Sequence, residues 1–338
     1  MTEKHKITLH GSELEFDCSR DDTILRAGLR VGLGLAYECN VGACGSCKFD
    51  LLEGEVEDLF PDASGIRPKE REKGKRLACQ CRPLSACKIK IRTGEEYVSQ
   101  HKPRPQIVRL AKKTEVTHDL IEFTFEADTP AEFIHGQYAM LSCDALPQPR
   151  AYSMSNGPNP EGRWQFIIRK VPNGTFTQYL FEHAKVGDQF RIDAPYGIAH
   201  LNTAADRQIV GIAGGSGLAP VLSIMRGAQE KRKKFGKPIM LYGARTPRDI
   251  PAHPEIDFYN SQDFVFAPVV SDSESAETSG WTGDIGFVHE FIGKKLSGSL
   301  TDYEFYLAGP PPMIEAAVRL LMVEHKIPNN QIHFDRFF

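Results

Sequence analysis

The sequence contains no apolar run long enough to span a bilayer, and its first ten residues have no apolar core of the kind that a secretion signal requires. It also has little net charge, because 41 basic residues nearly balance 44 acidic ones and leave a formal charge of -3. Attraction to nucleic acid through charge alone is therefore not expected. These absences predict a cytoplasmic protein with neither a membrane nor a nucleic-acid partner.

The length and the cysteine distribution set the next limits. A chain of 338 residues exceeds the usual size of one hydrophobic core, which predicts two or three domains. Eight cysteines in a long chain without a secretion signal do not indicate a disulfide framework. Seven of the eight precede residue 90, and six of those fall into two short segments. This clustering favours metal binding.

The pattern of strands and helices changes twice along the chain. The first ninety-odd residues alternate short β-patterned runs with a helical stretch at 23–31, as in a small mixed sheet over one helix. Residues 106 to about 200 are nearly all β-patterned with frequent turn residues, which predicts an antiparallel barrel. From residue 207, strand, glycine loop and helix alternate, which predicts a doubly wound parallel sheet. The expected parts are a domain at 1–98, a linker at 99–105, and domains at 106–204 and 205–338.

Cys39, Cys44 and Cys47 stand in C-x4-C-x2-C spacing, and Cys79 follows after thirty-one residues. Four thiolates with this plant-type spacing match a [2Fe–2S] cluster, whereas a zinc ribbon requires paired C-x2-C knuckles. Glycines inside the first segment suit a loop that folds around a cluster. Cys79 and Cys81 would share a face of an extended segment, so geometry leaves the fourth ligand open between them.

A second motif begins at the strand that ends with Ala213. The glycines of segment 214–220 let the backbone approach a pyrophosphate, whose charge a helix N-terminus favours. The motif differs from the G-x-G-x-x-G fingerprint because Pro220 occupies its third position, and proline suits a first helical turn. After the next strand, Arg245 would favour the 2′-phosphate of NADPH and Asp249 the free ribose of NADH. The local residues leave this choice open.

With these motifs in place, the first domain resembles the plant-type ferredoxins, whose fold is a β-grasp. The remainder resembles the ferredoxin–NADP reductase superfamily, which implies a β-barrel that binds FAD and an α/β domain that binds NAD. This order of domains is similar to the reductase components of bacterial multicomponent oxygenases, such as those of toluene monooxygenases and carbazole dioxygenases. The resemblance favours Cys79 as the fourth ligand, because it follows Leu77 in an L-x-C pattern like that of the family.

The resemblance also implies a flavin site. Arg150 to Ser153 match the superfamily motif R-x-Y-[ST]. In that motif the arginine would bind the flavin pyrophosphate, Tyr152 would lie beside the isoalloxazine ring, and Ser153 would hydrogen-bond to N5. Segment 174–177 would offer backbone amides to the phosphates. The expected flavin-binding residues are Arg150, Ala151, Tyr152, Ser153, Ile168, Lys170, Gly174, Thr175, Phe176, Thr177 and Phe337.

For the nicotinamide, the superfamily usually has C-G-P-P-x-M near its C-terminus, and this chain has Ala308 in place of the cysteine. Related enzymes end in an acid followed by an aromatic ring over the flavin, which implies such roles for Asp335 and Phe337. The alternative is a terminal strand whose phenylalanines fill the core. Ser153, Asp335 and Phe337 are the residues expected beside the chemistry. The expected nicotinamide-binding residues are Gly214, Gly215, Gly217, Pro220, Arg245, Gly309, Pro310 and Met313.

The resemblance implies an electron path from NADH through FAD and the [2Fe–2S] cluster to the oxygenase of an aromatic-hydrocarbon mono- or dioxygenase system, or to its Rieske ferredoxin. NADH is preferred to NADPH because the similar reductases use it, and the free protein is expected to be a monomer. One alternative is a reductase with the same cofactors that serves another acceptor, as in deoxysugar biosynthesis. Another is a redox sensor, against which the nicotinamide motifs argue. The basic run 67–76 would either steer an acidic partner or form a solvated surface.

Overall fold

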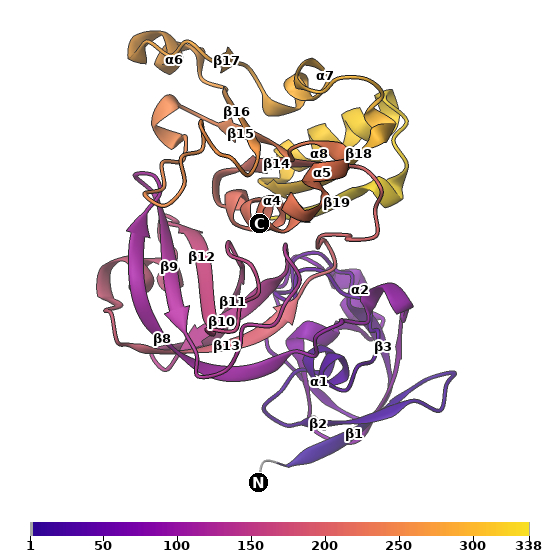
Figure 1. The fold of residues 1–338 in the computed structure, drawn as a ribbon. Helices are drawn as coiled ribbons and strands as arrows, with labels where there is room; N and C mark the ends of the chain where they lie inside the picture. The colour runs from indigo at the N-terminus through magenta and orange to yellow at the C-terminus, as the bar shows by residue number, and fades with distance from the viewer. Residues whose placement is uncertain (1–2, 338) are drawn as a thin grey trace. The chain divides into compact units, whose positions relative to one another are not determined.

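The fold in Figure 1 is a computed structural model that describes residues 3–337. Contacts between residues divide the chain into two compact units. The first comprises Met1–Pro105 and Asp193–Ile198, and the second comprises Gln106–Ile192 and Ala199–Phe338. In the described part of the chain, no helix is both long and apolar enough to cross a membrane.

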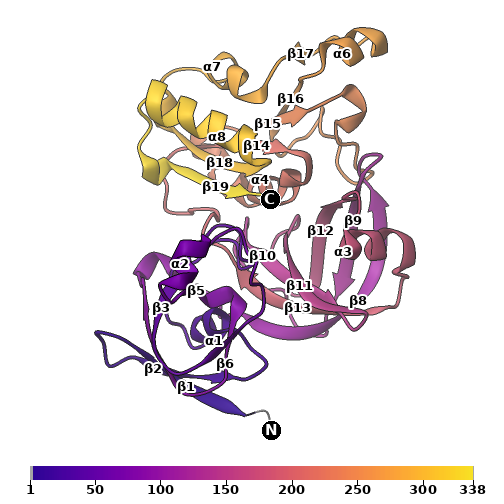
Figure 2. The same cartoon turned by 180° about the vertical axis from the view of Figure 1, so that it is seen from behind.

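The first unit is a mixed sheet that wraps around helix α1 (Figures 1 and 2). Across residues 3–337 this sheet has the strand order β2-β1-β7-β3-β5, in which β1 runs antiparallel to β2 and parallel to β7. The Thr23 hydroxyl accepts a hydrogen bond from the Arg26 amide and so begins α1, which buries Ile24, Leu25 and Leu29. This is the β-grasp arrangement, so that prediction is confirmed. Its elements are β1 (Lys4–Leu9), β2 (Glu15–Ser19), α1 (Ile24–Arg30), β3 (Lys48–Glu53), β4 (Val56–Asp58), α2 (Pro68–Glu72), β5 (Lys75–Leu77), β6 (Cys81–Pro83) and β7 (Cys87–Ile91).

The basic run forms structure that its sequence did not predict. Pro68 begins α2 after Arg67, whose amide donates to the Glu70 carboxylate at 3.0 Å. The same carboxylate accepts from Lys48 of β3 at 3.0 Å. A five-residue helix is too short for a periodic pattern to reveal it, and its capping contacts depend on the neighbouring strand.

The second unit begins with a curled antiparallel sheet of strand order β11-β10-β13-β8-β9-β12 within the described residues. Its two outer strands meet, because Met154 forms a bridge with Phe166 and the Ser155 amide donates to the Gln165 carbonyl at 2.8 Å. The predicted antiparallel barrel is thereby confirmed. Its strands and helix are β8 (Arg104–Glu115), β9 (Leu120–Glu126), β10 (Tyr138–Cys143), β11 (Leu146–Ser153), β12 (Arg163–Arg169), α3 (Thr175–Gln178) and β13 (Gln189–Tyr196).

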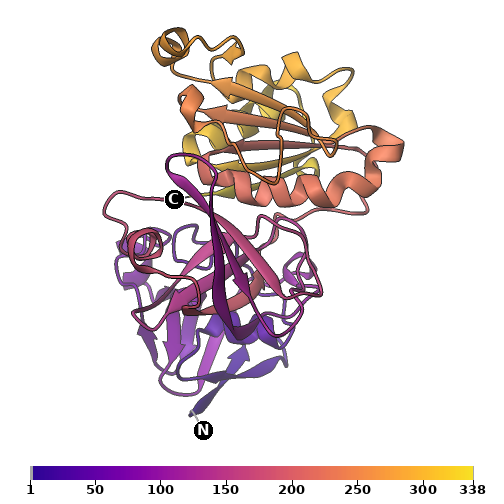
Figure 3. The ribbon, with the colours of Figure 1, turned by 60° about the vertical axis from the view of Figure 1, so that its left-hand side comes forward.

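A parallel sheet completes the second unit, with strand order β17-β16-β15-β14-β18-β19 among residues 3–337. Alternate residues of β14 face two apolar clusters: Ile209 packs with residues of α4, and Val210 packs with residues of α8. Helices therefore cover both faces (Figure 3), and the doubly wound prediction is confirmed. The elements are β14 (Gln208–Gly214), α4 (Leu218–Gly227), α5 (Arg232–Phe235), β15 (Ile239–Ala244), β16 (Val265–Val270), α6 (Ser273–Ser279), β17 (Asp284–Ile285), α7 (Ile292–Lys295), β18 (Tyr303–Gly309), α8 (Pro311–Arg319) and β19 (Ile332–Arg336).

A buried polar cluster joins the barrel to the parallel sheet. Glu122 of β9 and His253 are 3.0 Å apart, with side chains 2% and 1% exposed, and Ser155 donates to Glu122 at 2.6 Å. Burial raises the pKa of Glu122, but the hydrogen bonds from His253 and Ser155 outweigh it and leave this pKa below its usual value. Arg226 of α4 donates to the Ser155 carbonyl at 2.9 Å. These buried polar contacts therefore fix α4 and the barrel relative to each other.

Candidate functional site

The four predicted cysteine ligands form two pairs of sulfur atoms. Cys47 Sγ and Cys79 Sγ are 3.3 Å apart, and the Cys39 and Cys44 thiols are hydrogen-bonded to each other. The bond from Cys39 lowers the pKa of Cys44 to about 5, whereas burial raises the pKa of Cys81 to about 12. The Cys81 thiol is hydrogen-bonded to the Leu77 backbone, whereas Cys79 pairs with the thiol of Cys47. Two thiolate pairs suit two irons, one pair for each iron.

The loop that carries three of these cysteines has the backbone shape that a cluster requires. Gly42 and Gly45 have φ of 84° and 79°, and a Cβ atom on Gly45 would lie 2.4 Å from the Gly65 carbonyl oxygen. Backbone amides point at sulfur: the Cys44 amide is 3.3 Å from Cys39 Sγ. Such N–H donors stabilise a cluster and help to set its reduction potential.

A buried donor beside the first ligand also fits a bound cluster. Asn40 follows Cys39, has a φ of 55°, and is 1% exposed. Its Oδ1 accepts from Arg26 Nε at 3.3 Å, but its Nδ2 has no hydrogen-bond partner in the part of the chain that the structure describes. A buried donor without an acceptor is costly, and a cluster sulfide or thiolate is the kind of acceptor that would satisfy it.

The predicted flavin motif lies on β11, paired with β10. Arg150 is exposed, and its guanidinium contacts oxygens of Gln148 and Pro149 but no carboxylate among the described residues. A cation without an acidic partner suits a phosphate ligand. Tyr152 stacks on Phe176 with ring centroids 6.0 Å apart, and Ser153 is 7% exposed. The flavin motif at 150–153 and the segment 174–177 are therefore in contact through the rings of Tyr152 and Phe176.

The remaining predicted flavin residues occupy two further segments. Thr177 belongs to the four-residue α3, and its hydroxyl donates to the Gly174 carbonyl at 3.1 Å. Ile168 is 1% exposed in the barrel core, and Lys170 forms an ion pair with Glu182 at 2.8 Å. The roles of Ile168 and Lys170 in flavin binding stay predictions. Ala151, Gly174 and Thr175 lie beside the aromatic pair in sequence.

A cavity of about 470 Å³ opens at the carboxyl ends of the parallel strands, where doubly wound sheets bind their ligands. Five of the predicted nicotinamide residues line it: Gly214, Gly215, Arg245, Pro310 and Met313. The predicted Gly217, Pro220 and Gly309 are not among its lining residues. Gly217 instead lies close against β18, since a Cβ atom on it would be 2.0 Å from the Ala308 carbonyl oxygen. The methyl group of Ala308 is buried in the adjacent core.

The cavity carries charges of both signs. Asp119 and Arg169, at the ends of facing barrel strands, form an ion pair of 2.6 Å at its edge. Burial raises the pKa of Asp119, but the hydrogen bonds from Arg169 and Thr117 prevail and lower this pKa overall. Asp249 accepts from the amide and the hydroxyl of Thr246, both at 2.8 Å. Its carboxylate is thus held in place by its own turn.

The predicted C-terminal residues continue the parallel sheet. Asp335 lies opposite Ala308 in the register of β18 and β19. The Phe337 amide donates to the Gly309 carbonyl at 3.0 Å, and its ring packs against the core cluster that contains α4. The roles of Asp335 and Phe337 beside a flavin stay predictions.

Several lining residues were missed by the sequence motifs. Some lie at or after the ends of parallel strands, others come from the barrel, and Pro312 and Ala316 come from α8. Strand ends were the signal that could have revealed the first group. Ser271 directly follows β16, and Phe287 follows β17 by two residues. The missed residues are Asp119, Leu120, Arg169, Tyr242, Gly243, Ala244, Ser271, Gly286, Phe287, Val288, His289, Pro312 and Ala316.

Three families match successive parts of the chain. The 2Fe-2S iron-sulfur cluster binding domain matches residues 7–84. The oxidoreductase FAD-binding domain matches residues 107–201, and the oxidoreductase NAD-binding domain matches residues 212–319.

Similar proteins extend the match to nearly the full length. The ferredoxin–NAD(P)(+) reductase CarAd of Metapseudomonas resinovorans is 40% identical over 95% of this chain and 96% of its own length. The xylene/toluene monooxygenase electron transfer component XylA of Pseudomonas putida is 33% identical over 98% of this chain and 93% of its own. Among solved structures, the ferredoxin reductase in carbazole 1,9a-dioxygenase has a TM-score of 0.90 at 36% identity and 99% coverage of both chains. The Amycolatopsis cytochrome P450 reductase GcoB has a TM-score of 0.81 at 26% identity and 98% coverage of both.

Proposed function

Because this chain belongs to the family of iron–sulfur flavoprotein reductases that serve multicomponent oxygenases, we propose that it passes electrons from NADH to the oxygenase of an aromatic-hydrocarbon mono- or dioxygenase system. The observation that carries the proposal is that one chain contains both a set of paired cysteine sulfurs, in its first unit, and a cavity at the carboxyl ends of parallel strands, in its second unit. A nicotinamide donor and a one-electron carrier in the same chain have a use only if a flavin connects them.

Each of the three predicted cofactors has its own residues. Cys39, Cys44, Cys47 and Cys79 would hold the cluster. Arg150 would hold the FAD pyrophosphate, with the ring near the Tyr152–Phe176 pair. Bound FAD supplies the chemistry that accepts two electrons as hydride and releases them singly. The chain itself contributes position and electrostatics, since none of its side chains has to act as a nucleophile.

The charges at the cavity support NADH over NADPH. Two arginines and two aspartates line it, so it has no excess of positive charge to attract a 2′-phosphate. Arg169 is already paired with Asp119, and Arg245 shares the cavity with the fixed carboxylate of Asp249. An acid at this position favours a free ribose and repels an added phosphate.

The electron acceptor is expected to be the oxygenase component itself or a Rieske ferredoxin that serves it. CarAd carries the name of a ferredoxin reductase and XylA that of a monooxygenase electron transfer component, and the present chain is similar to both. We further propose that it acts in the cytoplasm, where NADH is made and thiols stay reduced, and that it is a monomer when free.

The decisive experiment mixes the purified reductase with candidate oxygenase components and their ferredoxins, and follows NADH-dependent oxygen uptake together with product formation. Coupled product formation with one system is the expected result. Rapid NADH-dependent reduction of cytochrome c without any coupled oxygenase would point to another acceptor. A colourless protein after reconstitution with iron, sulfide and FAD would refute the whole proposal.

A further inference from the structure

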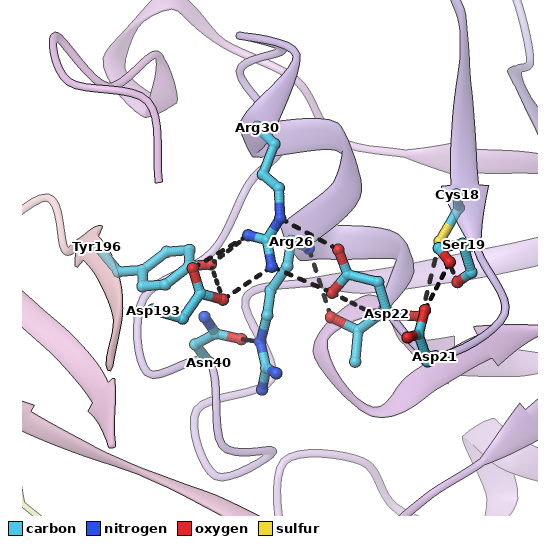
Figure 4. Close-up of polar contacts among 10 residues, drawn as sticks. Cys18, Ser19, Asp21, Asp22, Arg26, Arg30, Asn40, Asp193 and Tyr196 are labelled. Atoms are coloured by element: carbon cyan, nitrogen blue, oxygen red, sulfur yellow. Dashed lines mark hydrogen bonds and ion pairs between the residues drawn. The ribbon is translucent and has the colours of Figure 1, made fainter. Parts of the chain in front are cut away.

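The guanidinium group of one arginine in the first unit forms hydrogen bonds and ion pairs with three side chains. Arg30, at the end of α1, donates to both carboxylate oxygens of Asp193, at 3.1 and 2.9 Å, and to the Tyr196 hydroxyl at 3.1 Å (Figure 4). On its other edge, Nε lies 3.3 Å from the Asp22 carboxylate. A planar fork that binds two carboxylates at once is a geometry that lysine cannot reproduce.

The partners of Arg30 lie at the end of β13. Asp193–Ile198 belongs to the first unit, although β13 starts at Gln189 in the second. Tyr196 is fully buried and donates to Asp193 at 2.8 Å. The buried contact between Arg30 and the end of β13 therefore lies within the first unit.

The same strand end also contacts the segment that leads into the cluster loop. The Gly197 amide donates to the Tyr37 hydroxyl at 3.0 Å, and the rings of Tyr37 and Tyr196 meet edge to face with centroids 6.4 Å apart. Tyr37 is 1% exposed and lies two residues before Cys39. The residues before this ligand are thereby attached to the end of β13.

On its other side, the cluster loop is attached to α1. Arg26, one turn before Arg30, donates to the Asn40 side chain directly after Cys39. Cys39 is thus flanked by two anchors, Tyr37 and Asn40, which connect to the strand end and to the helix. The contacts of α1 with Asn40 and with Asp193 are drawn in Figure 4. With the Gly197–Tyr37 hydrogen bond, the helix, the strand end and the cluster loop form one closed set of contacts.

We propose that Arg30, Asp193 and Tyr196 are positioning residues that, together with Tyr37, hold the residues before Cys39 in place against segment 193–198 of the first unit, and that they thereby set the rate at which the cluster accepts electrons. This proposal rests on the proposed function and adds to it the residues that control one internal step. Electron transfer falls steeply with distance, so a small loss of position slows this step and leaves the hydride step unaffected.

The test compares Arg30→Lys with the wild type in anaerobic single-turnover reactions with NADH. Flavin reduction is followed by its absorbance and cluster reduction by the electron paramagnetic resonance signal of the reduced cluster. We expect cluster reduction to slow a few-fold while flavin reduction stays unchanged, because a small displacement of the cluster affects only the step that depends on its position. In steady state, reduction of cytochrome c should fall, and reduction of ferricyanide, which takes electrons directly from flavin, should not.

Two further variants make the result specific. Tyr196→Phe removes one hydroxyl from the contact and keeps the buried ring, so it should slow cluster reduction less than Arg30→Lys does. Arg20→Lys alters an exposed ion pair with Glu3, 3.4 Å long, in the same unit and should change nothing. Thermal unfolding and iron content of all variants show whether each one folds and carries its cluster.

The outcomes separate the two proposals. A wild-type rate of cluster reduction in both Arg30→Lys and Tyr196→Phe would overturn the inference. So would a slower rate explained by a shifted cluster reduction potential, because the residues would then tune the cluster and not its position. If NADH fails to reduce the cluster of the wild type, the proposed function itself is wrong.

Discussion

The cluster loop and the nucleotide cavity differ in how they are built. Three of four predicted cluster ligands lie within nine residues of one loop, whose shape is set by its own glycines and by amides that point at sulfur. The cavity draws its lining from the barrel and from the ends of several parallel strands. A local site can be recognised from spacing, whereas a site assembled from distant elements depends on the fold that brings them together.

The largest expected effect tests the local character of the cluster site. Cys79→Ser removes the partner of Cys47, so cytochrome c reduction should fall by about two orders of magnitude while ferricyanide reduction continues. Cys81→Ser is the matched control, two residues away, and should retain its cluster and its activity. Loss of the cluster in Cys81→Ser, with retention in Cys79→Ser, would reverse the assignment.

The next effect tests the long-range construction of the second unit. Glu122→Gln weakens the buried pair with His253 and should lower the free energy of unfolding by about 3 kcal/mol at neutral pH. Because the folded state lowers the pKa of Glu122, its contribution is present above the ordinary value of 4.5 and is lost as pH falls through the folded-state pKa. Denaturant unfolding of wild type and variant across this range should show the difference shrink on acidification.

The exposed Glu126 on the same strand provides the control for that experiment. Glu126→Gln should leave the unfolding free energy within about 0.5 kcal/mol of the wild type at each pH. A pH-independent difference between Glu122→Gln and wild type would contradict the assigned role of the carboxylate.

A smaller effect separates the two sites from each other. Gly217→Ala places a Cβ atom 2.0 Å from the Ala308 carbonyl, which forces the glycine turn away from β18. We expect KM for NADH to rise about tenfold, with an unchanged iron content, in steady-state assays with ferricyanide. Gly293→Ala, where an added Cβ meets nothing within 4 Å, should behave as wild type. Loss of iron in Gly217→Ala would show that the sites are not independent.

The smallest effect concerns the choice of nucleotide. Asp249→Asn keeps a side chain able to accept from Thr246 but removes the negative charge at the cavity, so kcat/KM for NADPH should rise a few-fold relative to that for NADH. Asp257→Asn, in an exposed turn where the acid accepts from the Asn260 side chain, is the control. An unchanged ratio in Asp249→Asn would remove the charge argument for NADH.

The sequence motifs predicted the cysteine ligands more completely than the lining of the nucleotide cavity. The cysteine spacing predicted Cys39, Cys44 and Cys47 and left the fourth ligand open between Cys79 and Cys81. The family pattern favours Cys79, whose Sγ lies 3.3 Å from Cys47 Sγ in the structure. At the cavity, the glycine turn and the G-P-P-x-M segment were recognised, but Asp119 and Arg169 were not. Asp119 directly precedes β9 and Arg169 ends β12, so they lie 95 and 45 residues before Gly214, and no local pattern connects them to a nucleotide. The short helix α2 was missed because five residues show no periodicity.

By itself, the sequence determined which cofactors this protein can bind, since cysteine spacing, glycine turns and strand order act over short stretches of chain. Only the tertiary structure decided how α1 holds the end of β13, because Arg30 and Asp193 are 163 residues apart in sequence. Contacts between such distant residues depend on the packing of two complete elements. The route that we propose for electrons depends on those contacts as much as on the cysteines.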